Sequence, residues 1–261
     1  MESRAEEQVF LQIEGPMATV VINNPPANSL SRSVYRALDR VIDELEHNTD
    51  IRVCILTGNG EKVFVGGADI AECATFDQRE MKEYIALNRR VFGRLERVRF
   101  PVLCALNGHA FGGGCELALA CDIRIARKGI KIGQPEVTVG VIPGSGGTQR
   151  LLQLIPKGKA LWMMMSGLSL DGAEAERVGL IDIVAEGEVM VEAKKLALRI
   201  ADNAPLAVSA VKKLVYDKMN ERLDEGLQLE AQVIEWLNET EDAKEGYQAF
   251  LEKRPPRFKG K

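Results

Sequence analysis

A triple glycine followed by a glutamate is the first segment whose residue types could do chemistry. Gly112, Gly113 and Gly114 follow a predicted strand and precede Cys115 and Glu116 at the start of a predicted helix. Glycines leave the backbone open to a ligand, and the free N–H groups at the N-terminus of a helix favour negative charge. The segment predicts a site for a phosphate or an oxyanion, and a tightly packed turn is the alternative.

The nucleotide-binding patterns do not fit these glycines. The dinucleotide pattern G-x-G-x-x-G needs glycine at position 117 or 149, where the chain has Leu117 and Gln149. The triphosphate loop needs a lysine after its last glycine, and Gly146-Gly147-Thr148 lacks one. Both nucleotide interpretations are therefore excluded.

A second glycine segment could supply another backbone donor. Phe64-Val65 leads into Gly66 and Gly67, so another N–H group has no bulky side chain in front of it. Two such donors from separate loops are what an oxyanion hole requires. The segment would be an ordinary turn if it stood alone.

Two glutamates lie beside loops that carry no large polar residues. Glu116 belongs to the apolar segment 115–120, and Glu136 follows Gly133 in a stretch that continues to Thr148. Burial disfavours a charged carboxylate and raises its pKa toward neutrality. Two carboxyls in different protonation states can act as base and acid. A solvated surface charge is the alternative, and the apolar neighbours of Glu116 disfavour it there.

Together these segments resemble the crotonase superfamily, and most closely its enoyl-CoA hydratase subtype. The resemblance covers nearly the whole chain and rests on residues 64–70, 108–118, 121–123, 133–151, 167, 173–174, 179–180 and 250–254. It implies a crotonase-like spiral of ββα units with a C-terminal α-helical oligomerisation region. It also implies an acyl-CoA thioester as substrate, no cofactor beyond the coenzyme A of that substrate, and a homotrimer or a dimer of trimers.

The resemblance assigns roles to four residues. Gly66 and Gly113 would donate backbone N–H groups to the thioester oxygen. Glu116 would take a proton from water as its oxygen attacks the β-carbon, and Glu136 would deliver a proton to the α-carbon. Such hydration of a 2-enoyl-CoA to a 3-hydroxyacyl-CoA builds negative charge on the carbonyl oxygen, which two backbone donors stabilise.

One position departs from the family pattern. Many hydratases resemble Ala-Ala-Gly-Ala-Asp where this chain has Val65-Gly66-Gly67-Ala68-Asp69. Because the donor is a backbone group, we expect Gly66 to keep the role.

Further substrate contacts follow from the same resemblance. Around coenzyme A we expect Lys62, Gly67, Ala68, Asp69, Ile70, Gly112, Phe258 and Lys259. Around the acyl chain we expect Ala27, Ile70, Phe76, Met81, Ile85, Val139, Gly140, Val141 and Ile142. Lys62 would meet a phosphate, and Phe258 and Lys259 would reach a neighbouring subunit's coenzyme A. Ordinary surface positions are the alternative for these three.

Composition excludes several other classes of protein. The 261 residues carry a net charge of −4, which gives no global attraction to nucleic acid or anionic lipid. Only two histidines are present, His47 and His109, so a His-rich metal site is excluded. The five cysteines form no C-x-x-C pair, which disfavours a zinc site, and we expect no metal. Their odd number and apolar surroundings indicate reduced, buried thiols.

The sequence is also compatible with other enzymatic activities. An isomerase of the same fold normally works with one carboxylate, so glutamates at both 116 and 136 favour a hydratase. A hydratase specialised for cyclic or branched acyl-CoA is also compatible. A serine hydrolase would use Ser145, but Gly144-Ser145-Gly146 is not the G-x-S-x-G motif, and His109 would have to be its base.

A nucleic-acid-binding protein is the alternative from another class. Five arginines lie in segment 89–99, but Glu96 lies among them, Glu83 belongs to the same predicted helix, and the chain is acidic. A solvated helix face explains this segment better than an RNA-binding surface.

Strands and helices alternate around the candidate residues. Alternating apolar residues predict a β-hairpin, and helical spacing predicts a helix that begins after Ser31. We expect strands at 9–13, 18–22, 51–57, 101–106, 122–126 and 180–184, and helices at 78–97, 115–120 and 160–165. This order predicts an α/β core of repeated strand–helix units.

The last quarter of the chain has a different pattern. We expect only helices there, at 191–201, 207–218, 225–237 and 242–252. Asp242 and Glu245 have the spacing of a reciprocal N-cap. We therefore expect a catalytic core over 1–195 and a helical trimerisation region over 196–261, docked on its own core or on another subunit. The acidic N-terminus and the lack of a long apolar run predict a cytoplasmic protein.

Overall fold

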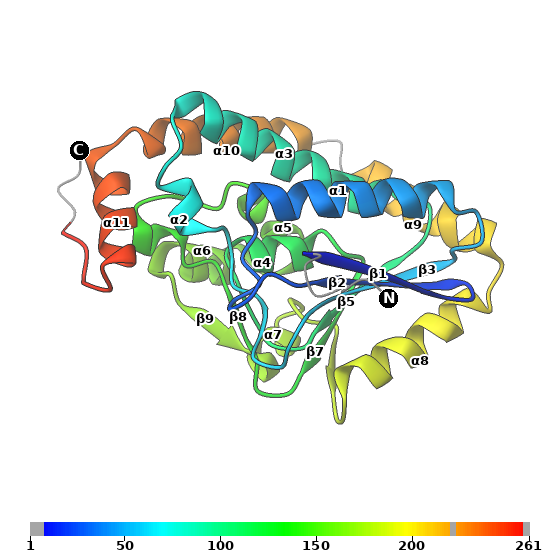
Figure 1. Ribbon diagram of the computed structural model, residues 1–261. Coiled ribbons are helices and arrows are strands. Elements are labelled where there is room, and N and C mark those ends of the chain that lie inside the picture. Colours follow the sequence, from blue (N-terminus) through cyan, green and yellow to red (C-terminus); the bar gives the residue numbers. More distant parts are fainter. Residues whose placement is uncertain (1–7, 220–222, 258–261) are drawn as a thin grey trace.

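Two β-sheets form the centre of the computed structural model, which describes residues 8–219 and 223–257 (Figure 1). The larger sheet has the strand order β1-β2-β3-β5-β7-β10, and the smaller has the order β4-β6-β8-β9. Helices cover both faces of the larger sheet, with α1 on one side and α8 on the other (Figure 1). The α/β class predicted from the sequence is confirmed.

The larger sheet begins with the predicted hairpin. Strands β1 (Val9–Glu14) and β2 (Met17–Ile22) pair antiparallel around Gly15, whose φ is +58°. The parallel strands are β3 (Val53–Gly58), β5 (Val102–Leu106), β7 (Ile123–Arg127) and β10 (Ile183–Ala185).

The predicted start of the last strand, at 180, is wrong. The backbone N–H groups of Leu180 and Ile181 donate to the carbonyl of Ala175, so they prolong the turn after the preceding helix. Residue pairing with β7 begins at Ile183.

Alternation along β3 explains how both faces of this sheet are buried. Val53 and Ile55 pack with residues of α8 (Val189–Ala201), while Cys54 and Leu56 belong to the cluster that contains α1 (Arg32–His47). All four are buried, as expected for a strand covered by helices on both faces. The long helix α3 (Gln78–Arg97), whose bounds match the prediction, packs beside α1.

The smaller sheet positions the glycine segments. Its strands β4 (Val63–Val65), β6 (His109–Phe111), β8 (Lys131–Gly133) and β9 (Ser169–Asp171) are too short to show a period-2 pattern, and the sequence analysis did not predict them. Each of the two glycine segments begins where β4 or β6 ends. A Cβ on Gly114 would lie 2.0 Å from the carbonyl oxygen of Val65, so only glycine lets the two segments meet.

Short helices complete the core. They are α2 (Ile70–Cys73), α4 (Gly113–Leu119), the single 3₁₀ turn η2 (Glu136–Val139), α5 (Gly147–Leu154), α6 (Lys157–Ser166) and α7 (Gly172–Arg177). The helices predicted at 115–120 and 160–165 correspond to α4 and α6. Neither η2 nor α5 has enough residues to show helical periodicity.

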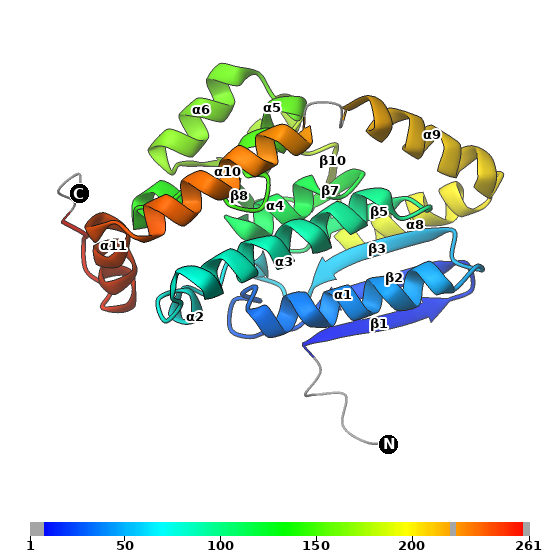
Figure 2. The ribbon, with the colours of Figure 1, turned by 90° about the horizontal axis from the view of Figure 1, so that it is seen from above.

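The C-terminal quarter is helical, as predicted, and docks on the core of its own chain. It contains α9 (Pro205–Met219), α10 (Leu223–Asn238) and α11 (Glu241–Leu251). Helix α10 lies against α3 and α5, and α11 packs against η2 and α2 (Figure 2). The expected boundary at 195/196 falls within α8, which packs on the larger sheet, and the two-domain division stays a prediction.

The predicted N-cap of the last helix is wrong. The hydroxyl of Thr240 caps α11 by accepting the N–H of Ala243 (3.1 Å). Glu245 instead accepts hydrogen bonds from the guanidinium of Arg254 (2.7 and 2.9 Å). Thr240 holds the cap because it immediately precedes the helix, whereas Asp242 already lies in its first turn.

No helix in the described ranges combines the length and the hydropathy that crossing a bilayer would require.

Candidate active site

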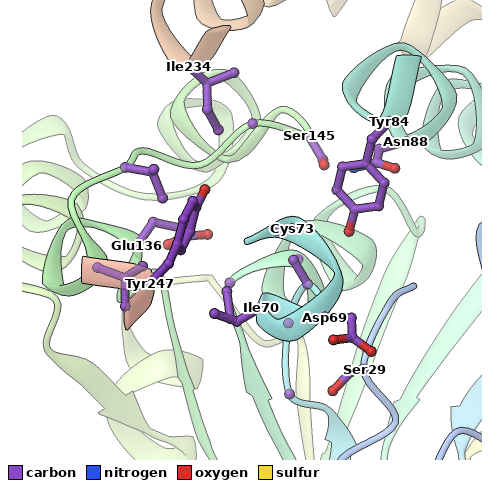
Figure 3. A pocket seen from close by; sticks show the side chains of 18 of the residues that line it. Ser29, Asp69, Ile70, Cys73, Tyr84, Asn88, Glu136, Ser145, Ile234 and Tyr247 are labelled. Carbon is purple, nitrogen blue, oxygen red and sulfur yellow. The ribbon is translucent and has the colours of Figure 1, made fainter. Parts of the chain in front are cut away.

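A cavity of about 450 Å³ lies where the glycine segments, η2 and the C-terminal helices converge (Figure 3). The fold brings together fifteen of the residues that the sequence analysis singled out. These lining residues are Ala27, Gly66, Gly67, Ala68, Asp69, Ile70, Met81, Ile85, Gly112, Gly113, Glu116, Glu136, Val139, Val141 and Ile142.

Other expected contacts do not line the cavity. Phe76 packs its ring against Tyr84 (centroids 5.3 Å apart) and beneath the guanidinium of Arg32 (4.6 Å). Gly140 ends η2 and faces α11, where a Cβ would lie 2.8 Å from the carbonyl of Asp242. Both were wrongly expected in the acyl pocket, because each packs against neighbouring helices instead. Lys62 is exposed outside the lining, and Phe258 and Lys259 lie outside the described residues.

The C-terminal helices supply lining residues that the sequence analysis did not single out. Ile234 projects from α10, and Tyr247, Phe250 and Leu251 come from α11 (Figure 3 labels the first two). The apolar spacing of these helices signalled that they dock on something, but it could not show what they face. The structure makes them a wall of the cavity in their own chain.

Glu116 is fixed by one of its carboxylate oxygens. It lies on α4, and only 2% of the residue is exposed. Its Oε1 accepts hydrogen bonds from the backbone N–H groups of Ser145 (2.7 Å) and Gly147 (2.8 Å). Its Oε2 accepts none from any described residue. The arrangement anchors the carboxylate and leaves one oxygen for a ligand in the cavity.

The surroundings of Glu116 make it a base that titrates near neutrality. Burial, and then the negative charge of Glu230, raise the pKa of Glu116 to about 7, although the two amide hydrogen bonds act in the opposite direction. A carboxylate with this pKa accepts a proton from water far more readily than an ordinary glutamate does.

Glu136 faces the same cavity from η2 (Figure 3). Burial, and then the charge of Glu116, raise the pKa of Glu136 well above its usual range. In the amide orientation that gives both side chains partners, Gln134 Nε2 donates to both carboxylate oxygens of Glu136 (2.8 and 3.2 Å). A Cβ on Gly112 would lie 3.1 Å from Glu136 Oε1, so the bare glycine lets this carboxyl approach the start of α4.

The expected oxyanion donor Gly66 is wrong, because its N–H is already in use. It donates to the carbonyl of Ala27 (2.8 Å). Leu30 bonds to the residues on either side of Ala68: its N–H donates to the Gly67 carbonyl (2.8 Å), and its carbonyl accepts from Asp69 (3.4 Å). This parallel bridge turns the N–H of Ala68 away from Leu30.

Ala68 and Gly113 instead supply two backbone donors at the cavity. Neither N–H has an acceptor among the described residues, and both residues line the cavity. The N–H nitrogen of Ala68 lies 3.5 Å from where a Cβ on Gly113 would be. Two unpaired N–H groups this close, on separate segments, match the requirement of an oxyanion hole.

The structure disfavours the serine hydrolase alternative. Ser145 lines the cavity, but its backbone N–H binds Glu116. His109 is absent from the lining; its Nδ1 accepts the N–H of Lys131 (2.9 Å), and its ring stacks on Phe111. His109 is thus a packed strand residue and not the base of a catalytic serine.

Acidic residues of α1 neutralise part of the arginine-rich segment. Arg94 bonds to Asp39, Asp43 and Glu46, and Arg90 bonds to Asp39 as well. These charges are thus used between two helices, which disfavours the nucleic-acid alternative.

Glu230 is a buried charged residue that the sequence analysis missed. It lies on α10 and is only 4% exposed. A signal was present, because Leu227, Ala231 and Ile234 mark a buried helix face to which position 230 also belongs.

Comparisons with known proteins agree with this geometry. The family model described as enoyl-CoA hydratase/isomerase matches residues 12–261. The chain is 42% identical to a short-chain-enoyl-CoA hydratase of Clostridium acetobutylicum (94% of this chain, 95% of the relative). It is 39% identical to a crotonyl-CoA hydratase of Syntrophomonas wolfei (97% and 98%). A crystal structure of an enoyl-CoA hydratase from Bacillus anthracis superposes with a TM-score of 0.80 at 36% identity (98% and 100%). The chain therefore belongs to the enoyl-CoA hydratase/isomerase family.

Proposed function

We propose that the protein is an enoyl-CoA hydratase, a hydro-lyase that adds water across the 2,3 double bond of a 2-enoyl-CoA. The observation that carries this proposal is one cavity lined by two glutamates of raised pKa and two unpaired backbone N–H groups. The relatives named above support the same activity.

The backbone donors would stabilise the developing negative charge. When water attacks the β-carbon of a conjugated thioester, charge accumulates on the carbonyl oxygen. The N–H groups of Ala68 and Gly113 would bind that oxygen, and losing one such donor typically raises the barrier by about 3–4 kcal/mol. These donors are already in position before substrate arrives, so no reorganisation is needed.

Each of the two glutamates would carry out one of the two proton transfers. Glu116, held through Oε1, would take a proton from the attacking water with its free oxygen. Glu136, whose raised pKa favours its protonated form, would deliver a proton to the α-carbon. One O–H bond of water and the C=C π bond break, and a C–O and a C–H bond form, without an oxidant. Glu116 would then release its proton and Glu136 would regain one before the next turnover, so the enzyme is regenerated.

The substrate would be an acyl-CoA thioester, with coenzyme A as part of the substrate and no separate cofactor or metal. Ile70, Met81, Ile85, Val141 and Ile142 give the cavity an apolar wall suited to an acyl chain. Ala68, Asp69 and Ile70 would border coenzyme A, and Lys62 would meet a phosphate.

We also propose an assembly and a location. Large apolar side chains stay exposed on the single chain, among them Trp162, Met165, Leu206, Leu214 and Trp236. A homotrimer or a dimer of trimers would bury such surface. All five cysteines are free and buried, which suits the reducing cytoplasm.

An absorbance assay of the conjugated thioester tests the function. Crotonyl-CoA and longer, branched and cyclic 2-enoyl-CoAs are each mixed with the protein, and loss of the conjugated absorbance is followed. We expect loss with at least one of them and formation of the 3-hydroxyacyl-CoA. No loss with any enoyl-CoA, together with release of free coenzyme A from a saturated thioester, would instead identify a thioester hydrolase.

A further inference from the structure

Glu116 and Glu230 both accept hydrogen bonds from one short backbone segment, residues 145–148. The N–H groups of Ser145 and Gly147 donate to Glu116 Oε1 (2.7 and 2.8 Å). Those of Gly146 and Thr148 donate to Glu230, at Oε1 (2.7 Å) and Oε2 (3.1 Å). Four successive N–H groups at the start of α5, where a helix cannot satisfy its own donors, thus alternate between two carboxylates.

The backbone conformation that permits this alternation needs glycine. Gly146 has a φ of +107°, a left-handed value that other residues rarely adopt. A Cβ there would also collide with the guanidinium of Arg150, at 1.8 Å. The segment is therefore built for this conformation and is not an adaptable loop.

Glu230 binds this segment as a hydrogen-bond acceptor. Besides the two N–H groups, its Oε2 accepts a hydrogen bond from the hydroxyl of Thr148, which itself accepts one from Gln149 Nε2 (3.0 Å). No lysine or arginine whose side chain the structure describes forms an ion pair with Glu230. Its hydrogen bonds all come from neutral groups around the segment that anchors Glu116.

We propose that Glu230 is a positioning residue for Glu116: it fixes the 145–148 backbone that anchors the base, and it places a second negative charge beside that base. The inference rests on the proposed function for the role of Glu116. Glu230 does not line the cavity, so it acts through Glu116 and not on the substrate.

The charged and titratable groups around the pair favour this electrostatic role. Glu136 on η2, Arg150 on α5, Tyr35 on α1 and the adjacent Cys115 influence Glu116 or are influenced by it. The guanidinium of Arg150 is bound to Glu96 on α3 (2.5 and 3.0 Å), which offsets its charge. Burial also raises the pKa of Glu230 itself. In its ionised form, Glu230 is after burial the largest contribution that raises the pKa of Glu116.

The substitution Glu230→Gln tests the inference, because it removes the charge and keeps the shape. A base must be ionised, so a lower pKa of Glu116 moves the low-pH limb of kcat/KM to lower pH. We expect a shift of about one pH unit, a fall in kcat of roughly 10- to 100-fold from the disturbed anchor, and KM within about twofold. Glu235→Gln is the matched control: it removes one charge from the same helix, at a residue outside the lining that only approaches Lys82 (3.9 Å), and we expect the wild-type pH profile.

A second readout keeps the inference separate from the proposed function. With ¹³C-labelled glutamate, the carboxyl signal of Glu116 is assigned by its loss in Glu116→Gln and is titrated without substrate. We expect a lower midpoint in Glu230→Gln even if the wild type hydrates no enoyl-CoA tried. An unchanged midpoint and an unchanged low-pH limb would overturn the role of Glu230 and leave the hydratase proposal standing.

Thr148→Val covers the case in which Glu230→Gln does not fold. It removes only the hydroxyl that donates to Glu230 and keeps every bond to Glu116. Losing this donor favours the neutral form of Glu230, so we expect a smaller shift of the Glu116 midpoint in the same direction. No shift in this variant would overturn the inference.

Discussion

Glu116 and Glu136 face one cavity, but the molecule supports them in different ways. Glu116 lies in α4 between Cys115 and Leu117, both fully buried, and two backbone amides hold its Oε1. Glu136 lies on the single turn η2, none of whose residues is fully buried, and its carboxyl bonds to the side chain of Gln134.

The elements behind each glutamate differ as well. Helix α4 packs against β4, β6 and α5, so the core of the fold supports Glu116. Turn η2 packs against α6 and the C-terminal helix α11, so its position depends on these two helices. The proposed base, Glu116, thus lies in the core, whereas the proposed acid, Glu136, lies at its periphery. We therefore expect substitutions to affect the two residues differently.

Removing either carboxylate should have the largest effect on turnover. We expect Glu116→Gln and Glu136→Gln each to lower kcat for crotonyl-CoA hydration by about 10²–10⁴-fold, the usual contribution of general acid–base catalysis. Binding of an acyl-CoA should persist, because the coenzyme A contacts that we propose are made by other residues. Steady-state kinetics and calorimetric binding of a saturated acyl-CoA measure the two effects. Turnover like that of the wild type in either variant would refute the two-carboxylate mechanism.

The pH dependence of kcat/KM should distinguish the role of Glu116 from that of Glu136. Glu116 must be ionised to act as a base, so kcat/KM should fall about tenfold per unit below its pKa of about 7. Glu136 must be protonated to act as an acid, and because its pKa is raised, kcat/KM should also fall on the alkaline side. Because the carboxylates interact, the two limbs report apparent values of the pair. A kcat/KM that is flat from pH 5 to pH 9 would contradict this assignment.

A larger side chain at the contact between η2 and α11 should affect Glu136, which lies on η2. A Cβ on Gly246 would lie 2.2 Å from the carbonyl oxygen of Val139, so Gly246→Ala must push the two elements apart. We expect a loss of about 1–3 kcal/mol in the free energy of unfolding. The alkaline limb of kcat/KM should change more than the acidic limb. Chemical denaturation and the pH profile measure this.

Gly158→Ala is the control for that substitution. A Cβ there meets nothing within 4 Å, so the variant should be as stable as the wild type or slightly more stable, since alanine favours helices. Equal stability of Gly246→Ala and Gly158→Ala would show that α11 does not constrain η2.

The smallest effect should come from Gly66→Ala. The N–H of Gly66 is bound to Ala27, so its role is structural, and the substitution keeps that N–H. A Cβ would lie 3.1 Å from Ala27, which requires a small shift of a cavity wall. We expect kcat/KM within about tenfold of the wild type, since no oxyanion donor is lost. A loss of 10³-fold or more, measured against Gly187→Ala as control, would make Gly66 a catalytic donor after all.

Several elements followed from local pattern alone. The hairpin of β1 and β2, the whole of α3 and the helical C-terminal quarter were predictable, because each has enough residues to show its period. The smaller sheet was not, because strands of three residues have no measurable period. The distribution of apolar residues also could not show that α10 and α11 dock on the core of their own chain.

The residue types of the site were determined by the sequence. Glu116, Glu136 and the glycines around them are compatible with an oxyanion site and two proton transfers, and the resemblance to the crotonase superfamily gave these residues those roles. Their apolar neighbours also predicted that burial would raise the pKa of these glutamates. The structure agrees with that direction for both.

The choice of backbone donor was decided only by the tertiary structure. Every residue from 65 to 69 carries an N–H, and local sequence does not tell which ones are already bonded. Pairing with Ala27 occupies the N–H of Gly66, and the bridge to Leu30 turns the N–H of Ala68 away from Leu30. Glu230 is placed beside Glu116 in the same way, across more than a hundred residues of chain, because packing of α10 on α5 is a long-range contact that no local pattern encodes.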